Sequence, residues 1–374
     1  MKIPIIFPIL LIILMFAIHY LFYSRVIKRV HVCPKTLFVL KGLVGLNFVG
    51  IIGYMLARYA ISVPDWLYFI FSLSFAVVLA FVMIGIMYEV LHLLQAKLPF
   101  DEQKRKFFKR SSDMGILALG GAYLGAGVYE GQKEPMVVNI KLDQKLFNKP
   151  YRIVQISDMH IGGLIDSNFV EKAVERINAL QADFVTITGD LTDAHIDSIK
   201  KAVDHLAHIQ SRFGTYYVVG NHEYFHGFED TVAYIKTLGI TVLENNSQVI
   251  GDSNNRFNIA GLYDYFGYRK GEYAPNIARV QAKVDKNLPT LLLMHQPKQI
   301  EMLESFKPNL MLSGHTHGGQ IFPFQYLVKL QQPYLKGLYN ISNKEAIYVN
   351  SGIGFWGPKM RLGSAAEITL IEWS

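Results

Sequence analysis

The chain has 374 residues, of which 51% are hydrophobic and 13% aromatic, and its formal net charge is +7. This composition can fill a folded core, so extended disorder is excluded, and the length allows one sizeable domain plus a second region. The single cysteine, Cys33, excludes a disulfide within the chain and a cysteine-rich zinc module.

The positive charge is concentrated in one part of the chain. Residues 1–131 hold 13 Lys or Arg against 6 Asp or Glu, which accounts for the whole excess, whereas residues 132–374 hold 24 of each. A polynucleotide-binding domain would carry a basic excess of its own. The distribution therefore indicates membrane topology and contact with anionic lipid, and it argues against a nucleic-acid partner.

Apolar runs in the first region predict transmembrane helices. The runs at 4–23, 37–59 and 66–94 are each about as long as the ~20 residues that cross a bilayer. No small-residue cleavage site follows the first run, so we expect an anchor and not a removed signal peptide. A fourth run, 112–129, is shorter and carries five glycines, and it either crosses the membrane or lies at its surface as a connector. With no internal repeat and few ionisable residues in the runs, we expect anchoring without transport.

The fourth run decides which side of the membrane the rest of the chain faces. Basic residues follow the first and third runs, and the positive-inside rule places both loops in the cytoplasm. These residues are Arg25, Lys28, Arg29, Lys35, Lys97, Lys104, Arg105, Lys106, Lys109 and Arg110. If 112–129 crosses, the second region faces outward; if it does not, that region stays in the cytoplasm.

The second region, 132–374, alternates short apolar strands with amphipathic helices. Strands are predicted at 151–157, 183–188, 215–219, 290–294 and 309–313. A cluster of His, Asp or Asn follows every one of them, and α/β sheets bind ligands at the carboxyl ends of their strands. The clusters comprise Asp158 and His160, then Asp190, then Asn221 and His222, then His295, and finally His315 and His317.

In the order DxH, GD, GNH, H, GHxH, these clusters resemble the motifs of the calcineurin-like metallophosphoesterase superfamily over about residues 150–371. The resemblance implies an α/β fold, a four-layer αββα sandwich, behind an N-terminal transmembrane helical region. It also implies two divalent metal ions, with Asp190 bridging them. Asp158, His160 and His317 would complete the first site, and Asn221, His295 and His315 the second.

Two ions ~3.5–4 Å apart can activate a water and clamp the attacking and leaving oxygens at phosphorus. The donors are all nitrogen or oxygen, which favours manganese, with iron or zinc as alternatives. His222 is expected to be catalytic, protonating the leaving oxygen or stabilising phosphoryl charge. Asp193 is expected either to support the site or to cap a helix. Histidines 195, 205, 208 and 226 have no motif around them, and we expect surface or capping roles.

The substrate expectation rests on two further stretches. These stretches, GHTHGGQ (314–320) and the closing segment 351–372, are similar to those of membrane-associated phosphodiesterases. Some bacterial members of that group resemble enzymes of lipid A synthesis. Those enzymes cleave UDP-2,3-diacylglucosamine to UMP and 2,3-diacylglucosamine 1-phosphate. This implies a multi-pass protein of the bacterial cytoplasmic membrane, with membrane lipid and a lipid-linked nucleotide or phosphodiester as partners; no protein partner can be inferred. One alternative is an outward-facing phosphodiesterase acting on phospholipid or cell-wall phosphates. Another is a non-catalytic membrane sensor, which the intact ligand set disfavours.

Two loops are candidates for substrate contact. The apolar segment 321–330 (IFPFQYLVKL) either lines an acyl or membrane-facing groove or packs as a hairpin whatever the substrate. The tyrosine-rich loop 262–275 contains Arg269 and Lys270, and it either stacks on a base or holds a phosphate, or is a rim loop with neither role.

Overall fold

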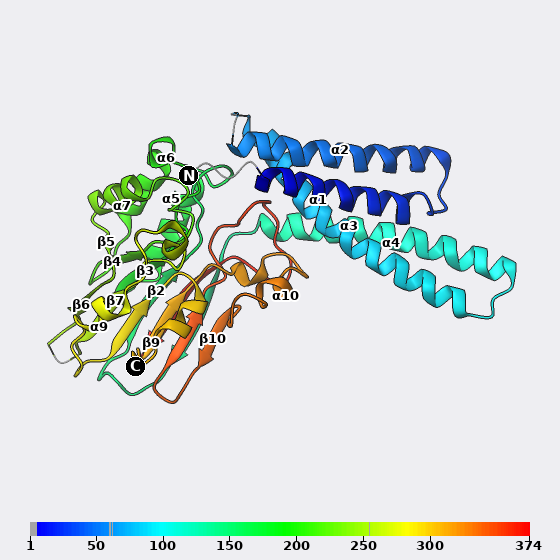
Figure 1. The fold of residues 1–374 in the computed structure, drawn as a ribbon. Coiled ribbons are helices and arrows are strands. Elements are labelled where there is room, and N and C mark those ends of the chain that lie inside the picture. Colours follow the sequence, from blue (N-terminus) through cyan, green and yellow to red (C-terminus); the bar gives the residue numbers. More distant parts are fainter. Residues whose placement is uncertain (1–5, 60, 62, 254) are drawn as a thin grey trace. The chain divides into compact units, whose positions relative to one another are not determined.

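A computed structural model describes residues 6–59, 61, 63–253 and 255–374 (Figure 1). The chain divides into two compact units. The first comprises Met1–Gln132 together with Gly357–Met360, and the second comprises Lys133–Trp356 and Arg361–Ser374. The peptide chain therefore passes between the units three times.

Four long helices make up the first unit. They are α1 (Ile6–Phe22), α2 (Pro34–Tyr59), α3 (Asp65–Lys97) and α4 (Glu102–Gly131), and a short π-helical turn, Tyr23–Ile27, follows α1. Within the described residues, three helical segments are long and apolar enough to cross a membrane: Ile9–Ile27, Pro34–Arg58 and Asp65–Lys97. They correspond to the three predicted runs, although residues 4 and 5 of the first run lie outside the described residues.

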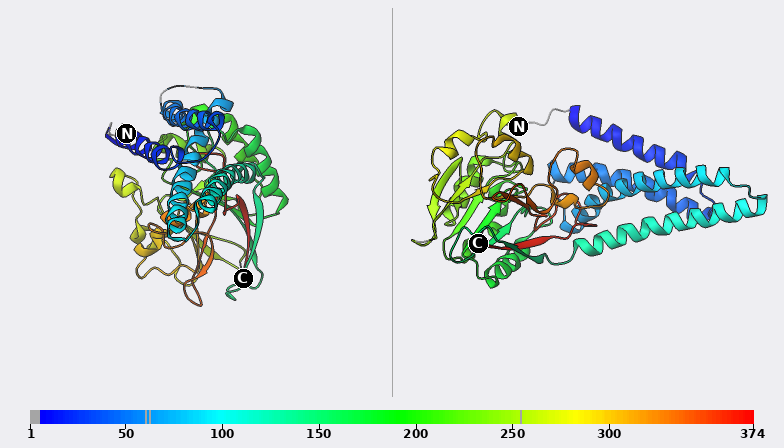
Figure 2. Two further views of the ribbon diagram at one scale, coloured as in Figure 1. Left: turned by 90° about the vertical axis from the view of Figure 1, so that its right-hand side faces the viewer. Right: turned by 90° about the horizontal axis from the view of Figure 1, so that it is seen from below.

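Helix α4 lies alongside α3 and runs in the opposite direction (Figures 1 and 2). Near its start, the Gln95 side chain of α3 donates a hydrogen bond to Ser112 Oγ at 3.0 Å. Further along, a Cβ on Gly120 would lie 2.5 Å from Ile84 Cδ1, so the glycine leaves room for the Ile84 side chain between the two helices. The fourth run is thus part of a helix of 30 residues, about 45 Å long at 1.5 Å per residue.

One end of the helical unit carries a polar cluster. The Arg29 guanidinium contacts Glu89 at 2.7 Å, and the buried Asp113 carboxylate contacts Lys109 Nζ at 3.3 Å and accepts the His31 backbone N–H at 2.7 Å. These residues come from the loop before α2, the end of α3 and the start of α4. The cluster fixes the start of α4 beside the two basic loops.

Two six-stranded mixed sheets form the second unit. The first has the order β1-β12-β2-β3-β4-β5 and the second β10-β11-β9-β8-β7-β6. The strands of the first sheet are β1 (Met136–Leu142), β2 (Tyr151–Ile156), β3 (Phe184–Thr188), β4 (Thr215–Val218), β5 (Thr241–Val242) and β12 (Glu367–Trp373). Those of the second are β6 (Asn246–Ile250), β7 (Phe257–Gly261), β8 (Thr290–Leu293), β9 (Leu310–Ser313), β10 (Gly337–Asn340) and β11 (Ala346–Val349). The five predicted strands correspond to β2, β3, β4, β8 and β9.

Three buried apolar clusters separate the layers of this unit. The central one contains side chains of both sheets, such as Phe184 and Leu291. The second joins the first sheet to helices α5 (Ser167–Ala179), α6 (Ile196–Val203) and α7 (Phe228–Thr237), and the third joins the second sheet to α9 (Ile277–Gln281) and the turn Pro297–Met302. Along β8 the side chains alternate, since Leu291 and Leu293 face the partner sheet whereas Leu292 faces the outer layer. The predicted αββα sandwich is confirmed.

Candidate metal centre

The site lies where the carboxyl ends of five strands meet. Strands β2, β3 and β4 are parallel neighbours in the first sheet, and β8 and β9 are parallel neighbours in the second. Asp158, Asp190 and Asn221 follow the first three strands, and His295 and His315 follow the other two. The packing of the two sheets therefore brings together side chains that are far apart in the sequence.

The backbone at the site is strained. Five candidate ligands, Asp158, His160, Asp190, His315 and His317, have φ angles between 49° and 69°. This left-handed region is unfavourable for residues with a Cβ and costs roughly 1–3 kcal/mol per residue. Such strain persists where the surrounding structure imposes it, and it is concentrated here on the residues that the motifs single out.

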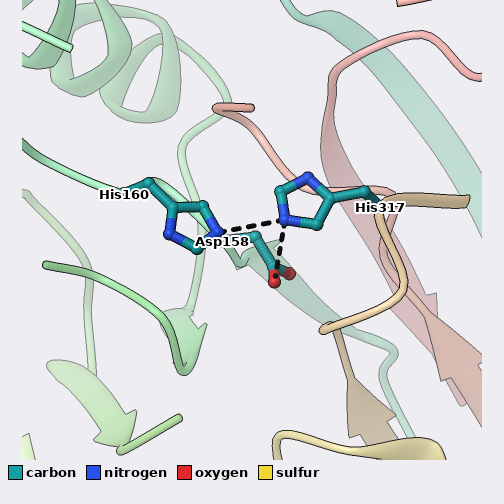
Figure 3. Close-up of side chains that lie close together, drawn as sticks. All are labelled: Asp158, His160 and His317. Atoms are coloured by element: carbon teal, nitrogen blue, oxygen red, sulfur yellow. Dashed lines mark hydrogen bonds and ion pairs between the residues drawn. The ribbon is translucent and has the colours of Figure 1, made fainter. Parts of the chain in front are cut away.

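Three side chains form the first group of donors: Asp158, His160 and His317 (Figure 3). The Nε2 atoms of His160 and His317 lie 3.0 Å apart, and His317 Nε2 lies 3.5 Å from Asp158 Oδ1. Both Asp158 oxygens also accept the His315 backbone N–H, at 3.0 and 2.9 Å. The donor atoms converge on one point, as the ligands of a metal ion do.

The second group contains Asp190, His295 and His315. His295 Nε2 lies 3.2 Å from Asp190 Oδ2 and 3.2 Å from His315 Nδ1. The other ring nitrogen of His295, Nδ1, lies 2.8 Å from the Thr188 carbonyl oxygen. A backbone carbonyl at that position requires a proton on Nδ1, which leaves Nε2 as the donor to a metal.

The side chain of Asn221 shows whether the residues at this site are suited to bind a metal ion. Its side-chain oxygen Oδ1 is buried and accepts no hydrogen bond from the residues that the structure describes. A buried amide oxygen without a partner costs roughly 1–3 kcal/mol, so its presence at this point needs a reason. A divalent ion supplies one, because an amide oxygen is a good ligand for it. The residues present therefore fit a metal centre.

Burial and neighbouring charges shift the pKa values of several candidate ligands. Burial lowers the pKa of His315 to about 3 and, with the neighbouring His160, holds the pKa of His317 well below its usual range, so both rings are neutral. Burial raises the pKa of the Asp158 carboxyl to about 7. Although burial alone would lower the pKa of His295, the Asp190 carboxylate raises it well above the ordinary value. The Asp190 carboxylate therefore favours positive charge at this point, which a bound cation would also supply.

His222 is held by Asp193. Its Nδ1 atom lies 2.5 Å from Asp193 Oδ1, and its Nε2 atom lies 3.8 Å from Asp190 Oδ2, so the ring is oriented with Nε2 toward the metal ligands. Asp193 also lies 3.5 Å from His226 Nε2. Of the two expectations for Asp193, support of the site is the one that the geometry favours, because the N-cap position of α6 belongs to His195.

Of the four histidines without a motif, three lie outside these groups of donors and away from Asp193. His195 contacts Asp230 at 3.3 Å, His205 Nε2 lies 2.8 Å from Ser167 Oγ, and His208 is exposed. These are the surface roles that the sequence predicts. His226 differs from that prediction, because it lies against the carboxylate that orients His222.

Sequence reasoning missed Glu223, which follows His222. Its buried carboxylate accepts backbone N–H groups from Asp190, Leu191, Thr192 and Gly220 at 2.6–3.2 Å. It thereby connects the loop after β3 to the loop after β4, and it fixes the position of the expected bridging aspartate. The sequence feature that could have identified Glu223 is its position as an acidic residue directly after the GNH motif.

Arg361 was also missed. This buried guanidinium donates hydrogen bonds to the carbonyls of Ser351, Gly352, Gly354, Ser364 and Ala365. The loop that it closes supports the first donor group, since Gly354 N–H donates to the Asp158 carbonyl at 3.1 Å. A Cβ on Gly352 would lie 3.2 Å from His317 Nδ1.

Loop 262–275 is largely occupied by internal packing. Tyr273 stacks on Phe228 with ring centroids 4.1 Å apart, and Tyr263 packs against both rings. These two tyrosines are therefore not available to stack on a base. Lys298, in the turn after His295, lies over the Tyr265 ring at 3.9 Å from its centroid, at the rim of the site.

Comparisons with known proteins agree with this geometry. Residues 151–319 match the family described as calcineurin-like phosphoesterase. An uncharacterized metallophosphoesterase of Helicobacter pylori strain J99 is 40% identical over 315 residues, which is 84% of this chain and 80% of that protein. A Danio rerio transmembrane protein with a metallophosphoesterase domain is 30% identical over 66% of this chain and 59% of its own length. An uncharacterized metallophosphoesterase of Bacillus subtilis is 30% identical over 71% of this chain and 96% of its own length.

Proposed function

The chain belongs to the calcineurin-like metallophosphoesterase family and is a metal-dependent phosphoester hydrolase, and within that family we propose that it is a membrane-anchored phosphodiesterase whose substrates are lipid-linked phosphodiesters. The observation that carries the proposal is the convergence of the two donor groups. The buried Asn221 oxygen without a partner among the described residues adds to it, because Asn221 directly precedes His222, whose backbone N–H donates to Asp190 Oδ1 at 2.9 Å. Family members typically use two divalent ions, and the seven predicted ligands supply a donor set for two. A non-catalytic sensor would have no need of this complete set.

The chemistry follows from the side chains. Two bound divalent ions would lower the pKa of an attacking water and neutralise charge on the phosphoryl oxygens. Asp158, His160 and His317 would hold one ion, Asn221, His295 and His315 the other, and Asp190 both. We assign His222 as the general acid, because Asp193 fixes the Nδ1 proton and leaves Nε2 to donate to the leaving oxygen. Manganese remains our first choice of metal, with iron and zinc as alternatives.

The course of α4 bears on which side the catalytic unit faces. This helix begins in the polar cluster beside the basic loops and extends back along α3 from there. Its apolar part, 114–129, therefore lies among helices that are long enough to cross a membrane, and Gln132 follows at the end away from those loops. Helix α4 is not among the three described segments that are long and apolar enough to cross by themselves, so the proposal of a fourth crossing rests on its course along α3. With the basic loops in the cytoplasm, that course favours a crossing and an outward-facing catalytic unit.

The orientation changes the order of the substrate hypotheses. The sequence favours UDP-2,3-diacylglucosamine, a nucleotide lipid whose head group is made in the cytosol. An outward-facing site favours the alternative, a phosphodiester of the outer leaflet such as a phospholipid or a lipid-linked wall polymer. We therefore propose the outward-facing phosphodiesterase, and we keep the nucleotide lipid as the second candidate because of the closing segment 351–372.

The test is hydrolysis by the full chain in detergent with Mn²⁺. We expect cleavage of bis-p-nitrophenyl phosphate and of phosphatidylglycerol, and loss of both activities in Asp190→Ala and His222→Ala. Release of UMP from UDP-2,3-diacylglucosamine, without cleavage of phosphatidylglycerol, would overturn the proposed substrate class. It would then favour a catalytic unit that faces the cytoplasm. No hydrolysis of any of the three substrates would overturn the proposed function.

A further inference from the structure

Apolar side chains lie exposed just beyond the last metal motif. They belong to the segment that follows GHTHGGQ and to the loop before residue 357, and we call them the aromatic rim: Phe322, Phe324, Tyr326, Leu327, Leu330 and Trp356. Leu330 is 81% exposed and Tyr326 60% exposed. Of the two alternatives for 321–330, the packed hairpin is not what the structure shows, because Gln325–Val328 form a short helix, α10, and these side chains are exposed.

The two parts of the aromatic rim are joined through Gln320. Its side chain accepts the Trp356 backbone N–H at 2.9 Å and donates to the Trp356 carbonyl at 2.9 Å. Gln320 lies three residues after His317, in the buried turn that ends the metal motif. The aromatic rim therefore lies next to the first donor group.

The composition of the aromatic rim and its place in the chain indicate what covers it. Aromatic residues beside lysines are typical of surfaces that enter the head-group region of a bilayer, and Lys329 lies within the segment. Trp356 is followed directly by Gly357–Met360, which belongs to the helical unit. That unit contains three helices that could cross a membrane. The chain thus returns to its membrane region one residue after the rim, so a bilayer is available to cover these side chains.

We propose that the aromatic rim inserts into the outer leaflet of the membrane and presents a lipid phosphodiester to the metal centre. This inference rests on the proposed function. Insertion would keep the acyl chains of the substrate in lipid while its phosphate reaches the site. The rim then determines specificity for substrates in a bilayer and has no part in the hydrolysis of soluble ones.

Depth-dependent quenching tests the insertion directly. The full chain with Cys33→Ser and Leu330→Cys is labelled with an environment-sensitive fluorophore and reconstituted into nanodiscs of phosphatidylglycerol and phosphatidylethanolamine, with and without doxyl-labelled lipid. The matched control is Val249→Cys, an exposed apolar position on β6 at the other edge of the second sheet. We expect strong quenching at position 330 and little at position 249. Equal quenching at the two positions would overturn the proposal.

A kinetic test separates the rim from the catalytic site. In the double variant Tyr326→Glu with Leu327→Glu, we expect KM for phosphatidylglycerol in vesicles to rise about tenfold, because two apolar side chains are lost from the lipid contact. Hydrolysis of soluble bis-p-nitrophenyl phosphate should stay unchanged. Equal loss on both substrates would overturn the proposal, since the rim would then act on the site itself. If the wild-type chain hydrolyses neither substrate, the proposed function fails while the quenching result still decides whether the rim inserts.

Discussion

At the scale of single residues, strain and burial mark the site as clearly as residue type does. Glycine would adopt the left-handed backbone of Asp158 or His317 at lower cost, yet these positions hold metal-ligand residue types. The Asn221 oxygen is likewise buried without a protein partner. Local stability is therefore lower here than the fold could provide, as is expected where binding of an ion compensates.

The pair formed by Asp193 and His222 gives a prediction about catalysis. Asp193→Asn replaces the carboxylate that holds the Nδ1 proton of His222 with a neutral amide, which is a weaker acceptor and can turn its NH2 group toward the ring, so kcat should fall about 10- to 100-fold. Metal content, measured by inductively coupled plasma mass spectrometry, should remain at the wild-type value, because Asp193 is not in the predicted ligand set. His226→Asn, which alters the longer contact of the same carboxylate, is the control and should have a small effect. Loss of metal from Asp193→Asn would show that this aspartate is a ligand.

The proton on His295 gives a prediction about pH. In the metal-free site the Asp190 carboxylate raises the pKa of His295 above its ordinary value, so a metal ion must displace a proton. Mn²⁺ affinity should therefore rise as the pH increases from 6 to 8. Isothermal titration calorimetry in buffers of different ionisation enthalpy should show proton release on binding. The Asp158 carboxyl, whose pKa burial raises to about 7, would contribute in the same direction. An affinity that is independent of pH over this range would mean that neither ligand releases a proton on binding.

At the scale of elements, the sequence was a good guide to the five strands that carry the ligand motifs and a poorer one to the other strands and to helix α4. The strands β2, β3, β4, β8 and β9 alternate or run apolar between turns, and each ends in a polar motif, so local pattern located them. Helix α4 joins a charged half to a glycine-rich half, and no local pattern shows that both halves continue as one helix. Its course depends on Asp113, which accepts a hydrogen bond from the loop before α2, and on Gly120, which lies close to α3, and both contacts are tertiary.

The same limit explains the missed site residues. The ligands were found because their spacing follows a family pattern at strand ends. Glu223 and Arg361 act by binding backbone groups of distant loops, and such contacts leave no periodic signal in the sequence. A buried charged residue that makes hydrogen bonds only to backbone groups can be recognised only in the folded structure, where the loops lie side by side.

Helix α4 gives a prediction about topology. In a Cys33→Ser background, Ser111→Cys and Gln132→Cys place single thiols on either side of the apolar part of the helix, residues 114–129. If α4 crosses, an impermeant maleimide should label position 132 in intact cells and position 111 only after permeabilisation. Labelling of both positions under the same condition would mean that α4 does not cross. The catalytic unit would then lie on the side of the basic loops.

At the scale of the whole molecule, the two units should respond differently to metal. All the predicted ligands lie in the second unit, and they join its two sheets through the loops after β2, β3, β4, β8 and β9. Bound ions thus stabilise the packing of one sheet on the other. The helical unit contains none of these ligands, and its stability comes from helix packing and lipid.

Removal of metal should therefore destabilise the catalytic unit alone. A ligand at 1,000 times its Kd stabilises the folded state by about 4 kcal/mol, so chelation should lower the melting temperature of this unit by several degrees. Differential scanning calorimetry of the full chain in detergent measures the shift, and circular dichroism at 222 nm follows the helices. In Asp190→Ala, which lacks the carboxylate expected to bridge the two ions, chelation should have little further effect. A shift of the same size in that variant would place the stabilising ion elsewhere, because a metal that binds through Asp190 cannot stabilise a chain that lacks it.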